Sequence, residues 1–319
     1  MRNEWFGSSL RPPARSAIRR RVASAPVARA VRVTLATILL AGGAMRAEPA
    51  RAADASSSPP RSLIESLFGR PPGAVDEPVG ERPIDADRPH LPESATAVGK
   101  GRVVLESGYT FSEKGASYSQ SFPEALLRVG VFADWFELRM GQNVLDQERT
   151  GPGGRGSAFG ATDLYLGAKV ALTGQRGLLP AIALIPQMTV PTGSRATTAD
   201  RVLPGLNVDG SWEVIDGLFS VEFVIATNQV ADDIRHSHLE VATGLTGAFR
   251  VTRALEAFVE WDAAYPSGSD RRGAGPRHTA VGGLVYFVSK DLEVDLRVGT
   301  GLSARSPDLQ LGAGFAVRY

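Results

Sequence analysis

Apolar and polar residues alternate along the last two thirds of the chain. In the final segment, apolar residues occupy every second position: Leu309, Leu311, Ala313, Phe315, Val317 and Tyr319. Side chains of a strand alternate between two faces, so this segment has one apolar face and one small or polar face. Strands of a membrane β-barrel have this form, with the apolar face toward lipid and the other toward a lumen. A half-buried strand of a soluble sandwich alternates in the same way, so the interpretation depends on how often the pattern recurs.

The pattern recurs from Lys100 onward, in about twelve segments of roughly 10 to 14 residues, the length that a tilted membrane strand requires. One face of these segments carries charged residues that we expect to line a lumen: Arg102, Glu106, Arg128, Glu137, Arg139, Glu222, Glu256, Glu260, Asp262, Glu293, Asp295 and Arg297. Such charges would be costly in a dry core, so they need water beside them. The opposite face carries almost no charge, as hydrocarbon requires. Residues 181–192 and 277–288 are less regular, and their facing stays unassigned.

These segments predict an all-β fold: a single antiparallel up-and-down transmembrane β-barrel of about 12 strands over residues 100–319. Short connections, at residues 132–135, 173–177, 215–217, 251–254 and 289–291, alternate with long ones such as 146–157, 192–203 and 266–276. Outer-membrane barrels have short periplasmic turns and longer external loops. We therefore expect both ends of the barrel on the periplasmic side.

The amino terminus has the order of a secretory signal. Residues 11–32 are rich in Arg and lack acidic residues, and residues 33–44 form an apolar run too short to span a bilayer as a helix. We assign residues 1–53 to a signal peptide region. Residues 54–99, rich in Pro, Ser and charge, are expected to form a disordered periplasmic linker. Within it, residues 62–68 could form a transient turn or a docking or plugging element.

Composition excludes several kinds of chemistry. The 35 basic and 34 acidic residues give no electrostatic reason to expect a nucleic-acid partner. The absence of cysteine excludes disulfides, thiolate metal sites and Cys nucleophiles. His236 and His238 could bind a metal with Asp232 and Asp233, but loop histidines are more often solvated. We expect no cofactor and no metal.

Short sequence matches in a fixed order resemble the family described as the MetA-pathway of phenol degradation. They are Asp87-Arg88-Pro89, Glu93-Ser94-Ala95, Gly101 to Thr110 with Glu106, Gly108 and Tyr109, Leu127-Arg128-Val129-Gly130, Glu137-Leu138-Arg139, Gly160-Ala161-Thr162-Asp163-Leu164 with Gly167 and Lys169, Pro191-Thr192-Gly193, and Gly312-Ala313-Gly314-Phe315 with Arg318. The resemblance covers nearly everything from Asp87 to Tyr319. It implies an outer-membrane barrel thought to pass small, often aromatic, compounds, and it carries over no binding residues.

The sequence favours a channel of the bacterial outer membrane for passive uptake or efflux of small compounds, including aromatic or hydrophobic ones. A barrel of about twelve strands has a narrow lumen. One alternative is an occluded or structural barrel without transport. Another is an outer-membrane phospholipase, but the chain has no G-x-S-x-G and no Ser, His and Asn at the spacing of that family, so we expect no enzyme.

The expected partners are outer-membrane lipid and lipopolysaccharide, a small-molecule solute and the barrel assembly machinery, which reads a terminal aromatic. Phe315 and Tyr319 are the candidate assembly signal. The later strands carry more acids than bases, and Glu256, Glu260 and Asp262 share one face. A conducting pore should therefore favour cations modestly.

Overall fold

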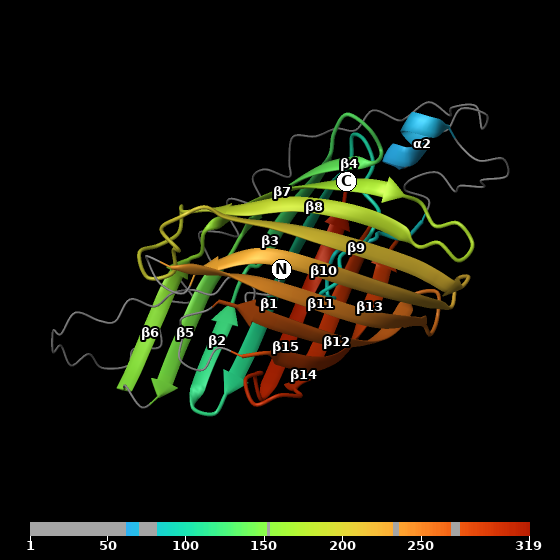
Figure 1. Cartoon of the computed structure of the whole chain (residues 1–319). Helices are drawn as coiled ribbons and strands as arrows, with labels where there is room; N and C mark the ends of the chain where they lie inside the picture. Colours follow the sequence, from blue (N-terminus) through green and yellow to red (C-terminus); the bar gives the residue numbers. More distant parts are fainter. Residues whose placement is uncertain (1–61, 70–81, 152–153, 232–235, 269–274) are drawn as a thin grey trace. The chain divides into compact units, whose positions relative to one another are not determined.

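The computed structural model describes residues 62–69, 82–151, 154–231, 236–268 and 275–319 (Figure 1). The predicted signal peptide, residues 1–53, lies outside the described residues, and so do residues 54–61 and 70–81 of the expected linker. The described strands are β1 (Val103–Lys114), β2 (Ser117–Ser121), β3 (Ala125–Gly130), β4 (Phe136–Gln142), β5 (Val144–Gly151), β6 (Gly154–Ala161), β7 (Leu164–Thr173), β8 (Ala181–Val190), β9 (Leu203–Ile215), β10 (Phe219–Ala231), β11 (Ser237–Arg250), β12 (Leu255–Ser267), β13 (Arg277–Ser289), β14 (Leu292–Gly301) and β15 (Leu309–Arg318).

Twelve of the described strands close into an antiparallel barrel. The ring runs from β15 back to β7 and then through β4, β3 and β1, and β1 pairs with β15 to complete it. The backbone of Tyr319 also pairs with that of Val103, with N–O distances of 2.8 and 3.1 Å, so the chain end meets the start of β1. The predicted fold class, a single up-and-down barrel of about twelve strands, is confirmed.

Alternation along each strand separates the two faces of the wall. On β14, Leu296 is 62% exposed and Val298 53%, whereas Asp295 and Arg297, which alternate with them, are 3% and 9% exposed. The apolar residues therefore face outward and the charged residues face the interior, as predicted. The structure also assigns the facing of β8, where Ala183 and Ile185 are buried and Met188 is exposed.

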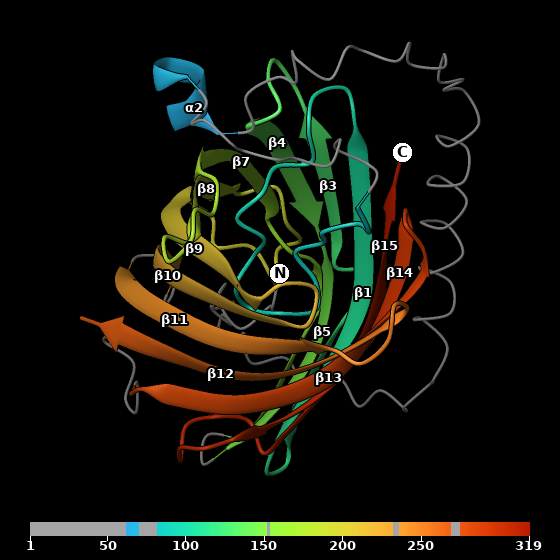
Figure 2. The same ribbon diagram turned by 90° about the vertical axis from the view of Figure 1, so that its right-hand side faces the viewer.

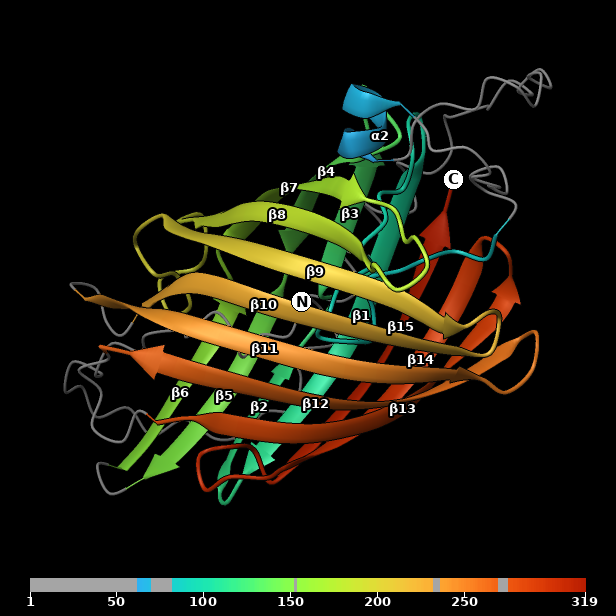
Figure 3. The ribbon, with the colours of Figure 1, turned by 45° about the vertical axis from the view of Figure 1, so that its right-hand side comes forward.

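Three neighbouring wall strands are each broken in two. The chain bends between β2 and β3 at Phe122–Glu124, between β4 and β5 at Asn143, and between β6 and β7 at Thr162–Asp163. Pro123 has no N–H to give to the sheet, and Glu124 has a φ of 44°. Beyond the break the sheet continues as β1-β2-β5-β6, side by side in Figure 1 and behind β8–β13 in Figure 3.

The prediction of a long external loop at residues 146–157 is wrong, because most of this segment forms the β5–β6 hairpin. Within the described residues, β6 pairs with β5 and with no other strand. The connection between β8 and β9 bonds to the start of β7 and the end of β6. Its Ser194 N donates to Ala161 O at 2.8 Å, and its Gly193 and Ala199 amides donate to the Asp163 carboxylate.

A short helix, α2 (Leu63–Phe68), begins at Ser62, whose hydroxyl caps the amide of Glu65. Glu65 also lies 3.7 Å from Arg176, which follows β7. Leu67 and Phe68 are exposed, so this helix is not the element that fills the lumen. Among the described residues, no helix has the length and apolar composition to cross a membrane.

Candidate functional site

Residues 82–99, hereafter the plug loop, pass inside the ring of strands (Figure 2). The loop enters at the end of the barrel that carries the short turns, where Ile84 N donates to Lys290 O at 2.7 Å. It leaves at the same end, where Lys100 N donates to Asp134 Oδ1 at 2.8 Å. The expectation of a disordered linker is therefore wrong for residues 82–99. This stretch has few apolar residues, and buried ion pairs with the wall hold it in place.

The predicted lumen residues face this loop. Nine of the twelve are buried: Glu106, Arg128, Glu137, Arg139, Glu260, Asp262, Glu293, Asp295 and Arg297. Glu222 and Glu256 are half-buried, and Arg102 lies just before β1. We expected water beside these charges. Instead, many of them bond to one another and to the plug loop, which compensates their burial.

Asp87 is the anionic centre of the plug loop. Its Oδ1 accepts from Lys169 Nζ and its Oδ2 from Arg139 Nη2, each at 2.7 Å, and Arg128 Nη1 lies 3.3 Å from Oδ1. Burial raises the pKa of Asp87, but the three cationic neighbours outweigh it and hold the pKa well below its usual range. Asp87 therefore stays ionised and joins the loop to β3, β4 and β7.

The wall needs this anion. Arg128 on β3 lies directly opposite Arg139 on β4, and like charges in that position repel each other. Glu137 and Glu106 accept hydrogen bonds from Arg128 at 2.9 and 3.0 Å. Asp87 bonds both arginines, so the plug loop completes the charge balance of this wall.

Arg88 joins the plug loop to β14, to β15 and to the break between β2 and β3. Its Nε donates to Asp295 Oδ2 at 3.1 Å, its Nη1 to Glu124 Oε2 at 3.2 Å, and its Nη2 to Ala313 O at 3.2 Å. Its side chain and those of both carboxylate partners are at most 3% exposed. Planar guanidinium groups suit such multidentate recognition, which an ammonium group cannot reproduce.

Two glycines make room for the Arg88 guanidinium. Gly108 on β1 and Gly314 on β15 are paired in register. A Cβ atom at Gly108 would lie 2.2 Å from Arg88 Cζ, and one at Gly314 would lie 2.3 Å from Arg88 Nε. A larger residue at either position would therefore push the Arg88 guanidinium out of this arrangement.

The tip of the plug loop, residues 90–92, reaches the wall formed by β10, β11 and β12. His90 Nδ1 shares a hydrogen bond of 3.0 Å with Glu222 Oε2, and Leu91 N donates to Glu260 Oε2 at 2.8 Å. The His90 ring meets Phe258 edge-on, with 4.4 Å between centroids. Together with the Asp87 and Arg88 contacts, these bonds place the loop across the lumen.

The contact of His90 with Glu222 should depend on pH. Burial lowers the pKa of His90, but the Glu222 hydrogen bond and the nearby carboxylates outweigh it and raise the pKa above 6.5. A raised folded-state pKa stabilises the protein below the unfolded pKa, and this stabilisation is lost as pH rises through the folded pKa. The Tm difference between the parent and His90→Gln should therefore be largest in mildly acidic buffer and shrink in alkaline buffer. A pH-independent difference in calorimetry would contradict this.

The residues of the plug loop that close the lumen were not predicted as lumen residues from the sequence. Asp87, Arg88 and Glu93 appear there only as parts of family-like motifs, and His90 and the buried Asp209 do not appear as lumen residues. Asp209 Oδ1 accepts from Glu93 N at 2.8 Å. The high density of charged residues at 85–93, just before the first strand, could have indicated partners on the barrel wall. The interpretation of this stretch as a linker did not use it.

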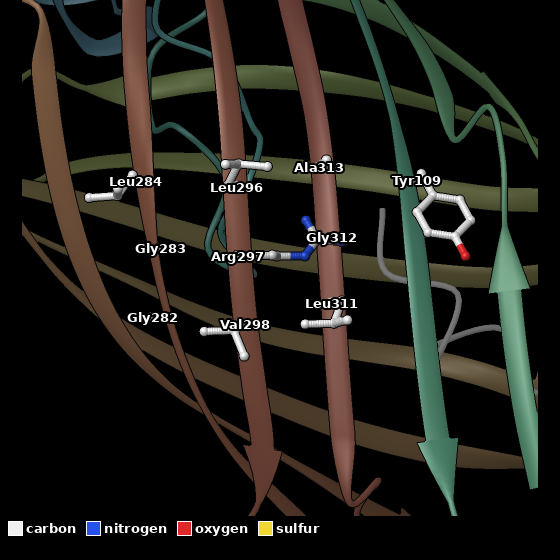
Figure 4. A pocket seen from close by; sticks show the side chains of 10 residues that line it. All are labelled: Tyr109, Gly282, Gly283, Leu284, Leu296, Arg297, Val298, Leu311, Gly312 and Ala313. Atoms are coloured by element: carbon white, nitrogen blue, oxygen red, sulfur yellow. The ribbon is translucent and has the colours of Figure 1, made fainter.

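A separate groove of ≈ 440 Å³ lies on the outer face of the wall and is not part of the lumen (Figure 4). Glycines lie along it, and its side chains come from β1, β13, β14 and β15: Tyr109, Leu284, Leu296, Val298 and Leu311. The leucines and Val298 belong to the exposed apolar face. In a bilayer this groove would be filled by acyl chains.

The family model described as the MetA-pathway of phenol degradation matches residues 86–319. The chain belongs to this family. The match begins inside the plug loop and runs to the chain end. It therefore includes the tip of the loop and every barrel strand of this MetA-pathway family member. No curated protein matches the chain.

Among solved structures, the fold resembles the COG4313 outer membrane channel from Pseudomonas putida F1, with a TM-score of 0.54 and 14% identity over 69% of this chain and 96% of that chain. More distant are the translocator domain of autotransporter NalP from Neisseria meningitidis (TM-score 0.39, 14% identity, 68% and 88% of the two chains) and the CymD monoaromatic hydrocarbon channel (TM-score 0.38, 10% identity, 69% and 88%). At these identities, the likeness to the first structure shows the barrel fold of this MetA-pathway family member.

Proposed function

We propose that the protein is a bacterial outer-membrane channel for the passive uptake or efflux of small compounds, including aromatic or hydrophobic ones. The supporting observation is a closed barrel with an apolar outer face, whose interior is filled by one loop of the same chain. That loop is held by noncovalent contacts and enters from one end only. Displacing it would leave a passage along the lumen. The family description, and the channel named in the resembling structure, agree with this role.

Uptake of an aromatic solute tests the proposal directly. Bacteria with the protein in their outer membrane should accumulate labelled toluene faster than the same strain without it, because lipopolysaccharide slows the entry of apolar solutes. Labelled sucrose is the control, since a narrow, filled lumen should exclude it. Equal toluene uptake by the two strains would contradict a transport role.

The filled lumen also favours a second candidate, an occluded or structural barrel without transport. In such a protein the plug loop would stay in place permanently. The uptake experiment separates the two functions, since an occluded barrel leaves toluene entry unchanged.

A catalytic role finds no support in the described part of the chain. His278, the histidine considered for a phospholipase, contacts Ser303 and Ser306 through its backbone: its N–H donates to both hydroxyls and its carbonyl accepts from Ser306. Its ring packs against Trp261 and Tyr265. Within the described residues, no group of three or more acidic or histidine side chains is placed to hold a metal ion. We propose that the protein is not an enzyme.

The acidic wall should give a conducting pore a modest cation preference. Glu256, Glu260 and Asp262 lie on the inner face of β12, and Glu256 also pairs with Arg250 at 3.0 Å. Changing the three to Gln, Gln and Asn should reduce cation selectivity, because low-dielectric walls focus the field of unbalanced charge. Reversal potentials under a salt gradient measure this. Equal potentials for parent and variant would mean that these carboxylates have a structural role alone.

Outer-membrane lipid, lipopolysaccharide and the barrel assembly machinery are the proposed macromolecular partners. The outward apolar face fits lipid. Phe315 is 39% exposed on that face and Tyr319 is 71% exposed at the short-turn end. Their exposure supports a role in recognition during assembly.

A further inference from the structure

Two groups of buried apolar residues lie among the charges on the inner face of β10, β11, β12 and β13. Val224 and Ala226 on β10, Ala242 on β11 and Phe258 on β12 face inward and are buried. We call these four residues the inner apolar patch. Most inward positions near it are charged or polar, among them Glu222 and Glu260. A barrel interior filled with water does not favour such a patch, so something apolar must cover it.

In this structure the plug tip covers the patch. Leu91 packs against Val224, Ala226 and Ala242. Gly244 lets the tip approach closely, since a Cβ atom there would lie 3.1 Å from Leu91 Cδ2 and 3.1 Å from Pro92 Cδ. The tip is therefore seated on the wall like a ligand in a shaped site.

His90 shows which chemistry the site recognises. Its planar ring meets Phe258 edge-on at an interplanar angle of 77°, and its Nδ1 bonds Glu222 Oε2 at 3.0 Å. The other ring nitrogen, Nε2, is buried and has no hydrogen-bond partner among the described residues. A buried polar atom without a partner costs free energy. His90 therefore fits the apolar and acidic features of the site but bears a cost that a ring without a second nitrogen avoids.

The tip and the base of the plug loop are held differently. The base contains the buried ion pairs of Asp87 and Arg88. The tip is held by the His90–Glu222 contact, one backbone hydrogen bond to Glu260 and the packing of Leu91. Breaking buried ion pairs is expensive, whereas opening a segment with fewer such contacts costs less. The tip can therefore leave the wall while the base stays bound.

We infer that the inner apolar patch, with Glu222 and Glu260 beside it, is a binding site for a small planar ring that carries a hydrogen-bond donor. The plug tip occupies this site as an internal substitute, and the ring displaces it. This inference rests on the proposed channel function and deepens it by naming the solute contact. The solute ring stacks edge-on against Phe258 and donates to a carboxylate, as His90 does. The ligand shifts the loop because it binds only the displaced state.

The absence of native cysteine allows a direct test. In Leu91→Cys, the thiol is covered by the wall and should react slowly with a maleimide. Phenol, which has a ring and a donor, should raise the labelling rate about tenfold at roughly nine times its Kd for the displaced state, because the ratio of displaced to seated tip rises by 1 + [L]/Kd. Toluene lacks the donor and cyclohexanol lacks the planar ring, so each should have a smaller effect. The same titration on Pro92→Cys provides a second reporter if Leu91→Cys folds poorly.

Two variants separate site binding from a general effect of the solute. Adding Phe258→Ala should abolish the phenol response, whereas the outward-facing Phe249→Ala on β11 should leave it intact. Ala95→Cys, in the returning part of the loop, should show no phenol-dependent change in labelling rate. An unchanged labelling rate with phenol, or a response that survives Phe258→Ala, would overturn the inference. Phenol-dependent labelling without faster uptake of labelled phenol in cells would instead contradict the channel function and leave the site standing.

Discussion

Replacing Asp87 with Asn should release the plug loop and open the lumen. An amide cannot accept the charge-assisted bonds of Lys169 and Arg139 on both its terminal atoms. Arg128 and Arg139 would then face each other without the anion between them. Removing one partner from a buried ion network costs about 3–5 kcal/mol. The open fraction should rise by roughly two to three and a half powers of ten. Single-channel recordings in planar bilayers measure that fraction.

Asp85→Asn is the matched control in the same loop. The Asp85 carboxylate accepts from the hydroxyls of Ser94 and Thr96, each at 2.6 Å. An amide oxygen can replace part of this bonding, and hydrogen bonds from neutral donors are weaker than those of charged groups. We expect a much smaller rise in open fraction. If both variants keep the parent's open fraction, the ion network does not hold the plug loop.

Changing Phe315 to Asp should impair assembly of the barrel. Phe315 lies on the outward face of β15, opposite Val294 of β14. A charge on the lipid face costs up to about 2–4 kcal/mol at the bilayer midplane, with acids at the lower end. The fraction of protein that shows heat-modifiable migration in detergent gels should fall, and material outside the membrane fraction should increase.

Phe315→Leu keeps an apolar side chain at this position and should assemble normally. Removing Tyr319 should also lower the folded yield, because its backbone pairs with Val103 where the barrel closes. Normal folded yield of Phe315→Asp would mean that β15 does not present this face to lipid.

The outer face of the barrel could be predicted because hydrocarbon imposes a strict rule on every second residue. Asp295, Leu296 and Arg297 show it: the two charged residues are buried inside, and the leucine between them is exposed outside. The rule fails beyond the lipid, where a strand needs no apolar face. β5 carries Asp146, Gln147, Glu148 and Arg149 in succession, so alternation could not distinguish this hairpin from a loop.

The contacts inside the barrel could be predicted only in part, because the residues that pair there are distant from each other in sequence. Arg88 meets Asp295, 207 residues away, and no local pattern records such a contact. The rule that a charged, Pro-rich segment stays disordered considers only the apolar surface that the segment itself can bury. Here the stabilising groups are ion-pair partners on the wall. β8 was ambiguous for a related reason, since its inward Ala181 and Ala183 pack against Ala95 and not against water.

The position of Arg88 between the first and last strands has a consequence for the order of folding. Asp87 binds β3, β4 and β7, which follow it early in the chain, whereas Arg88 binds β14 and β15, which are made last. Contacts between residues so far apart carry a large loop-closure entropy and form slowly. The plug loop can therefore settle against the early strands first and offer its guanidinium to the late ones as they arrive. In this scheme the loop acts as an internal template that helps β15 pair with β1. The barrel then closes at the same time as Arg88 makes its last contacts with the wall.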